Sequence, residues 1–217
     1  LKFRRVLFRS ISLTILGSMA QLLITLIMGL IGFQMVRSMP AWAQLPSGNF
    51  QFIAWETALL TMAGLLTLLL AFVFLRIRPI MQWLEKWRFL KRIVKYVVVL
   101  ETFSRKQLLR ILFLSFIRYL VFILQYVMIL RAFGADLTGT DCFWLLSVFY
   151  LLMAAIPTVG FSELPLRAAA SAALFSFFTG NGIAVQAAAF GIWIINLAIP
   201  AFGGGLLMIG HKLFKEK

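Results

Sequence analysis

The stretch Ile156–Ser171, IPTVGFSELPLRAAAS, decides the fold because it interrupts what would otherwise be one long apolar run. Pro157 and Gly160 are expected to end the preceding helix before it has crossed a bilayer. The apolar segments on either side are each only about 15 residues long, shorter than a perpendicular span. Irregular backbone at this depth is tolerated only where protein or a water-filled cavity covers it.

The second half of the stretch predicts a new helix that carries two opposite charges. Ser162 is expected to cap this helix, with Glu163 and Pro165 in its first turn. Arg167 follows Glu163 by four residues, the spacing at which two side chains pair along one helix face. We therefore predict a broken or re-entrant helical hairpin near Pro157–Arg167.

Composition places the hairpin in a membrane protein. Of the 217 residues, 62% are hydrophobic and 13% charged, and the mean hydropathy is +0.97. Soluble domains have roughly 45–50% apolar and about 25% charged residues, so a soluble enzyme, a nucleic-acid-binding domain and a disordered tail are excluded. With one Cys (Cys142) and one His (His211), the chain offers no disulfide framework, no metal site and no Cys/His or Ser/His/Asp catalytic set. We expect no metal, no cofactor and no enzymatic activity.

Apolar runs predict an all-α integral membrane protein with about six hydrophobic spans in a single polytopic domain, residues 10–217. Pro200 and Gly203–Gly205 interrupt the last run and are expected to act either as a hinge or break, or as ordinary Gly and Pro of a membrane helix. The predicted spans are residues 11–36, 52–75, 108–130, 142–156, 164–178 and 183–209.

The distribution of basic residues predicts the orientation. Segments 1–10, 76–110 and 211–217 carry 17 of the 21 Lys and Arg residues, whereas the loops 37–52 and 131–141 carry one each. By the positive-inside rule the basic segments are cytoplasmic, which places both ends of this chain on the cytoplasmic side of the membrane. The net charge of +14 is then explained by the orientation of the chain in the membrane, and no nucleic-acid partner is expected.

Two basic segments allow more than one interpretation. Residues 79–107 are predicted to form a cytoplasmic amphipathic segment that contacts anionic phospholipid headgroups, and we favour simple anchoring over specific lipid recognition. Residues 1–9 are either a cytoplasmic flank or foreign sequence joined to a truncated gene. We favour the second interpretation and therefore base no functional inference on these residues.

Ionisable and polar residues within the predicted spans are candidates for function, because they are costly in lipid. Arg118 and Gln125 share a helix face that is expected to point into the bundle or a wet cavity, where a structural partner and a substrate contact are equally good interpretations of Arg118. Glu56 lies near a span end and can reach water.

The hairpin is the strongest candidate for a binding site. The helix start at Ser162 together with Arg167 would receive a phosphate or carboxylate, and Glu163 would balance Arg167 in the empty state. The alternative is a salt-bridged hairpin that only packs. We favour binding, because a broken and charged hairpin is a costly way to pack a bundle.

Three runs of sequence resemble the lysylphosphatidylglycerol synthase transmembrane-region family, also called flippase-like. These runs are PTVGFSELPLRAAASAALF (157–175), AVQAAAFGIWIINLAIPAFGGGLLM (184–208) and GSMAQLLITLIMG (17–29). The resemblance implies paired re-entrant or broken helices around a lipid-accessible cavity, with roles for Pro157, Gly160, Glu163 and Arg167. The family's first Pro/Gly/Glu element would precede Ser10, so the chain is expected to be an N-terminally truncated fragment. No aminoacyl-transfer domain follows Lys217, and lipid aminoacylation by this chain is not expected.

These observations lead to two functional hypotheses. The first is a flippase-like, multi-pass protein of a bacterial cytoplasmic (inner) membrane that binds a phospholipid or related lipid-linked headgroup and translocates it between leaflets. The second is a non-transporting scaffold, a partner subunit of a lipid- or glycan-modifying enzyme. The expected partners are membrane lipids and either such an enzyme or further copies of the chain. The predicted headgroup-binding residues are Pro157, Gly160, Ser162, Glu163, Arg167, Arg118 and Gln125.

Overall fold

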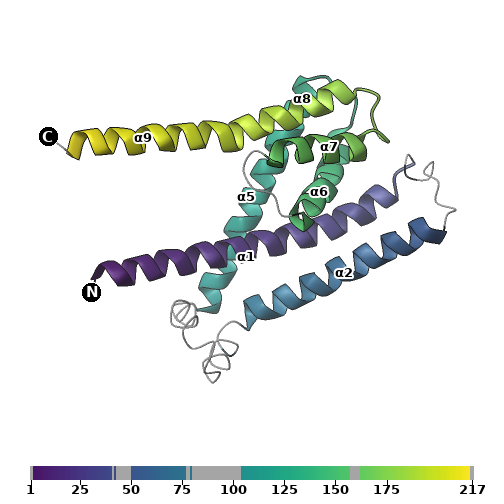
Figure 1. Cartoon of the computed structure of the whole chain (residues 1–217). Helices are drawn as coiled ribbons and strands as arrows, with labels where there is room; N and C mark the ends of the chain where they lie inside the picture. Colours follow the sequence, from purple (N-terminus) through teal and green to yellow (C-terminus); the bar gives the residue numbers. More distant parts are fainter. Residues whose placement is uncertain are drawn as a thin grey trace.

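The computed structural model describes residues 2–40, 42, 50–76, 79, 104–156 and 162–215, and within these ranges the chain is helical without strands (Figure 1). The predicted all-α fold is therefore confirmed for the described residues. The elements are α1 (Lys2–Arg37), α2 (Phe50–Leu75), α5 (Arg105–Ala132), α6 (Gly139–Ala155), α7 (Glu163–Phe175), α8 (Gly182–Trp193), the π-helical segment η4 (Ile194–Ala198) and α9 (Ile199–Lys215).

Three helical stretches of the described residues are long and apolar enough to cross a membrane, as expected of a helical membrane protein: Leu13–Arg37, Arg105–Ala132 and Gly182–Met208. Leu60–Leu75 and Gly139–Ala155 are shorter apolar helices. The number of six crossings remains a prediction.

Large apolar side chains cover the outer surface of α2. Met62, Leu65 and Leu68 are 69%, 68% and 70% exposed, whereas Phe74 is buried at 1%. A contiguous apolar surface of this kind would promote aggregation in water and is suited to contact with lipid chains. The exposed face of α2 therefore agrees with the membrane character of the composition.

The core is organised by one stripe of α5. Its residues Tyr119, Ile123, Tyr126 and Leu130 are buried and follow one another at intervals of four, three and four, the spacing of a single helix face. This stripe packs in one cluster with buried residues of α6 and α8, among them Leu145, Phe149, Val185, Ala188 and Ile192.

Helices α1 and α6 approach closely at two glycines. A Cβ atom at Gly29 would lie 2.5 Å from the Cβ of Leu151, and one at Gly32 would lie 2.6 Å from the Cβ of Ser147. Small residues at helix interfaces permit this backbone approach in membranes. The approach holds α6 against α1, and α6 ends at the predicted hairpin.

Helix α5 begins three residues before the predicted span. Ser104 and Gln107 form a capping box, in which the Gln107 N–H donates to Ser104 Oγ at 3.3 Å and the Ser104 N–H donates to Gln107 Oε1 at 2.7 Å. These bonds satisfy N–H groups at the helix start. The last residues of the predicted 79–107 segment, 105–107, therefore belong to α5. The rest of that segment, apart from Pro79, lies outside the described residues, and its amphipathic helix remains a prediction. Residues 2–9 are the first turns of α1.

The helix that begins with α8 continues to Lys215 without a break, and Figure 1 shows α8 leading directly into the long α9. The possible break at Pro200 and Gly203–Gly205 is therefore not found, because all four residues lie within α9. The chain accommodates Pro200 by a π turn just before it, in which the N–H of Ile199 donates to the carbonyl of Ile194, five residues earlier. Widening the helix there relieves the clash of a proline ring with the preceding turn.

Candidate functional site

The predicted interruption between two short helices is present. Helix α6 ends at Ala155, Ile156 is extended with φ −109° and ψ 110°, and α7 begins at Glu163. At about 1.5 Å per residue, α6 and α7 are about 26 and 20 Å long, less than the roughly 30 Å of a bilayer core. Pro157 and Gly160 lie outside the described residues, so their part in ending α6 remains a prediction.

Ser162 differs from its prediction. It occupies the N-cap position of α7, but its backbone is already helical, with φ −69° and ψ −16°, and its side chain makes no capping hydrogen bond. A capping serine normally has extended dihedral angles, which direct its oxygen toward the N–H groups of the first turn. The predicted capping by Ser162 is therefore wrong, whereas Pro165 does lie in the first turn of α7 as predicted.

Glu163 and Arg167 form the predicted ion pair. Arg167 Nη2 donates to Glu163 Oε1 at 2.6 Å, and the two side chains are only 23% and 13% exposed, in that order. The guanidinium carbon of Arg167 also lies 5.7 Å from the ring centroid of Phe149, which is fully buried. In such an apolar setting, removal of one partner leaves a charge that is costly to bury.

The ion pair lies between two cavities, and Phe122 and Tyr150 line both cavities together with the pair. Chamber 1, about 150 Å³, is completed by Ile192, Trp193, Asn196 and Leu197. Chamber 2, about 290 Å³, is completed by Gln21, Thr25, Tyr119, Met153 and Ala154.

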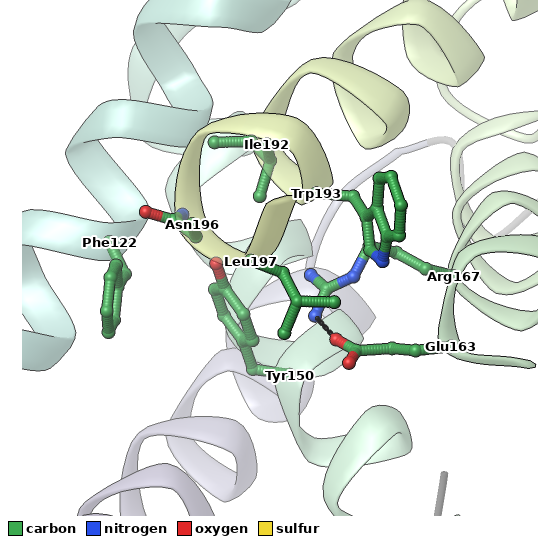
Figure 2. Close-up of a pocket in the computed structure, with 8 residues that line it drawn as sticks. All are labelled: Phe122, Tyr150, Glu163, Arg167, Ile192, Trp193, Asn196 and Leu197. Atoms are coloured by element: carbon green, nitrogen blue, oxygen red, sulfur yellow. Dashed lines mark hydrogen bonds and ion pairs between the residues drawn. The ribbon is translucent and has the colours of Figure 1, made fainter. Parts of the chain in front are cut away.

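Figure 2 shows the side chains that line chamber 1, with Arg167 among them. The Arg167 and Glu163 side chains enter from α7, the Arg167 guanidinium lies beside the Trp193 indole, and Tyr150 approaches from α6. The Tyr150 hydroxyl is close enough to the guanidinium for a polar interaction. The site thus offers one cation, one carboxylate and one phenol among aromatic and aliphatic walls, a set that can bind an anionic or zwitterionic group.

Asn196 is a site residue that the sequence argument missed. It lies in η4, lines chamber 1, and its Nδ2 donates to Gln125 Oε1 at 3.2 Å. This bond ties η4 to α5 beside the ion pair. Its sequence context could have identified it, because Asn196 is an amide side chain within an apolar run, as is Gln125. Tyr150 was missed as well, because tyrosine is common in apolar helices.

Arg118 does not join this group. Its side chain is exposed, its guanidinium carbon lies 5.2 Å from the ring centroid of Phe122, and it lines neither chamber. Arg118 is therefore not buried inside the bundle, whereas Gln125, on the same face, is partly buried against Asn196. A role of Arg118 in headgroup binding remains a prediction. The two side chains differ in that Gln125 has a partner on a neighbouring element, Asn196 of η4. Glu56 lies in α2, and its side chain is outside the described part of the chain.

Among the described residues, no group of three or more His, Cys, Asp or Glu side chains is placed to hold a metal ion. Comparison of the chain with models of known protein families, with curated proteins and with solved structures found no match. The family resemblance carried by residues 157–175 and 184–208 therefore remains a prediction.

Proposed function

We propose that the protein is a flippase-like membrane protein that binds the headgroup of a phospholipid or related lipid-linked molecule and assists its passage between leaflets. In this proposal the chain crosses a bacterial cytoplasmic membrane about six times, with both described ends on the cytoplasmic side, as the positive-inside rule predicts. Pro157, Gly160 and Ser162 shape the start of the site, and Arg167 binds the phosphate.

The observation that carries the proposal is the Glu163–Arg167 ion pair between two chambers of an apolar helical bundle. Ionisable residues at membrane depth are expensive, and a purely structural pair can be replaced by apolar side chains at little cost. Because this pair also borders open volume on two sides, we infer that it serves to bind a ligand as well as to pack the helices. The phosphate of a headgroup can replace Glu163 as the partner of Arg167, because an arginine fork suits phosphate oxygens.

The experiment is translocation of a fluorescent phospholipid in proteoliposomes, followed by chemical quenching of the outer-leaflet dye. We expect Arg167→Gln to slow translocation about tenfold or more, since a charge-assisted hydrogen bond to the phosphate contributes about 1.5–3 kcal/mol. Glu163→Gln should slow it as well, because it leaves Arg167 as an uncompensated charge in the empty site. Arg110→Gln and Asp136→Asn remove exposed charges outside the chambers and serve as matched controls.

The double variant Glu163→Gln/Arg167→Gln separates binding from packing. If the pair only stabilises the hairpin, neutralising both partners restores folding and with it the wild-type rate, because no uncompensated charge remains. Under the proposal the double variant stays monodisperse but translocates as slowly as Arg167→Gln. A wild-type rate in both single variants would remove the basis of the proposal.

The second candidate, a non-transporting partner subunit, draws support from α9. Among the described residues, α9 packs against no helix other than its own continuation through η4, and Phe202 and Leu207 are 72% and 77% exposed. Such a helix can pack against another subunit as well as against lipid. A wild-type protein that fails to accelerate translocation, yet co-purifies with one lipid- or glycan-modifying enzyme, would favour this candidate.

A further inference from the structure

The charges that line the two chambers balance each other in the empty site. Among the described residues that line the chambers, only Glu163 and Arg167 carry a full charge at neutral pH, and they pair at 2.6 Å (Figure 2). The other titratable side chains in the lining are the phenols of Tyr119 and Tyr150, which keep their protons at neutral pH. The empty site is therefore neutral, as a largely apolar bundle favours.

The neighbouring helices add no second cation or carboxylate to the described lining. The side chains from α1 are the neutral Gln21 and Thr25, and the polar side chain from η4 is the amide of Asn196. Arg118 of α5 is exposed and lines neither chamber. Any charge that enters the chambers must therefore be balanced by the ion pair itself.

An anion bound to Arg167 disturbs this balance. In the proposed function a phosphate replaces Glu163 as the partner of Arg167, which leaves two anions beside one guanidinium. Such an excess charge is costly in a buried setting, and two anions held close together favour protonation of one of them. A phosphodiester is a much stronger acid than a carboxylic acid, so the proton goes to the carboxylate of Glu163.

We propose that the site takes up one proton with each anion that it binds, and that the Glu163 carboxylate is the proton acceptor. The inference rests on the proposed headgroup-binding function and adds to it the ion that accompanies the headgroup. On binding, a proton from water attaches to Glu163 while the phosphodiester takes its place on Arg167. On release, Glu163 returns the proton to water and pairs with Arg167 again. Both states are neutral, so a monoanion crosses with one proton and moves no net charge.

The position of Glu163 suits this exchange. Its side chain is more exposed than that of Arg167 and borders both chambers. The chamber volumes of about 150 and 290 Å³ are larger than the roughly 30 Å³ of one water molecule, so water can reach the carboxylate from either side. The contact with Glu163 uses only Nη2 of the guanidinium, which has further N–H donors for the oxygens of an arriving anion.

The test counts protons during binding. Dioctanoyl phosphatidylmethanol carries a phosphodiester and no other titratable group, so a proton that is taken up belongs to the protein. Calorimetric titration of the purified full chain in detergent, repeated in buffers of different ionisation enthalpy, gives the number of protons per bound lipid. We expect about one proton, and an affinity that falls by up to about tenfold per pH unit between about pH 6 and about pH 8, because proton uptake is harder at higher pH.

Three variants assign the proton to its acceptor. Glu163→Gln is permanently neutral at this position, so it should take up no proton and bind with the same affinity across the pH range. Glu163→Asp keeps a carboxylate and should keep the proton uptake, which separates titration from the packing of the hairpin. Asp136→Asn removes an exposed carboxylate outside the chambers and should keep the wild-type proton count.

Proteoliposomes provide a second measurement, because the coupling gives translocation a direction. An acidic medium on the side of a fluorescent anionic phospholipid should accelerate its passage to the other leaflet. A membrane potential of either sign should have little effect, since no net charge moves. A rate that follows the potential and ignores the pH gradient would overturn the coupling.

The outcomes also distinguish this inference from the function on which it rests. Lipid binding by wild type without proton uptake would overturn the coupling while headgroup binding stands, and so would undiminished uptake in Glu163→Gln. No lipid binding at any pH, with Arg167→Gln indistinguishable from wild type, would overturn both. Dimethyl phosphate, the same phosphodiester without acyl chains, identifies the source of the anion. If it displaces the lipid at similar concentration with the same proton count, the coupling holds for a soluble phosphodiester, and otherwise it holds for the lipid headgroup.

Discussion

At the scale of single residues, Asn181 joins the two loops at one end of the bundle. Its Oδ1 accepts from the N–H of Ala184 and caps α8 at 3.1 Å, and its Nδ2 donates to the carbonyl of Gly134 at 3.0 Å. Gly134 has φ +77°, the left-handed conformation that ends α5 and that glycine adopts without strain. One side chain therefore fixes the end of α5 relative to the start of α8.

We expect Asn181→Ala to lower the free energy of unfolding by about 2 kcal/mol, since it loses one cap and one inter-loop hydrogen bond. The measurement is thermal or denaturant unfolding of the purified protein in detergent. Asn181→Asp keeps the capping oxygen and loses only the donor, so it should lose about half as much. Equal losses in the two variants would show that the cap contributes nothing.

At the scale of helices, the close approach of α1 and α6 depends on the absence of a side chain at Gly32. An added Cβ would meet the Cβ of Ser147 at 2.6 Å and the carbonyl oxygen of Trp144 at 3.1 Å, and neither atom is the end of a flexible chain.

We expect Gly32→Ala to destabilise the protein by about 1–2 kcal/mol, because overpacking outweighs the higher helix propensity of alanine. Gly64→Ala is the matched control, since an added Cβ in that part of α2 has no neighbour within 4 Å. The control should be neutral or slightly stabilising in the same unfolding measurement. A stable Gly32→Ala would mean that α6 can shift away from α1 at little cost.

The local features of the hairpin were predictable from the sequence. The interruption after Ala155 followed from a proline and a glycine between two short apolar segments, and the Glu163–Arg167 pair followed from a spacing of four on one helix. Both features depend on residues that are close together in the sequence.

The placement of Arg118 and Asn196 was not predictable, because it depends on which helix lies against α5 at each position along its length. Chamber 2 likewise joins Gln21, Tyr119 and Arg167 from three helices that are distant in sequence.

At the scale of the whole molecule, the predicted orientation places the loop between α5 and α6 outside and the start of α5 inside. We expect a cysteine at Asp136→Cys to react with a membrane-impermeant maleimide in intact cells, and one at Lys106→Cys to react only after permeabilisation. Wild type is the control, because Cys142 is buried and should not be labelled. Labelling of both positions from the same side would contradict the predicted crossing of α5.

The π turn at Ile194–Ala198 sets the rotational phase of everything that follows it. An α-helix advances about 100° per residue, so the one additional residue in this turn rotates α9 about its own axis relative to an uninterrupted helix. If these five residues returned to α-helical hydrogen bonding, Phe202 and Leu207 would swing about the axis by roughly that angle while α8 kept its place. The direction in which the C-terminal arm presents its side chains is thus set by the π-helical segment that precedes it.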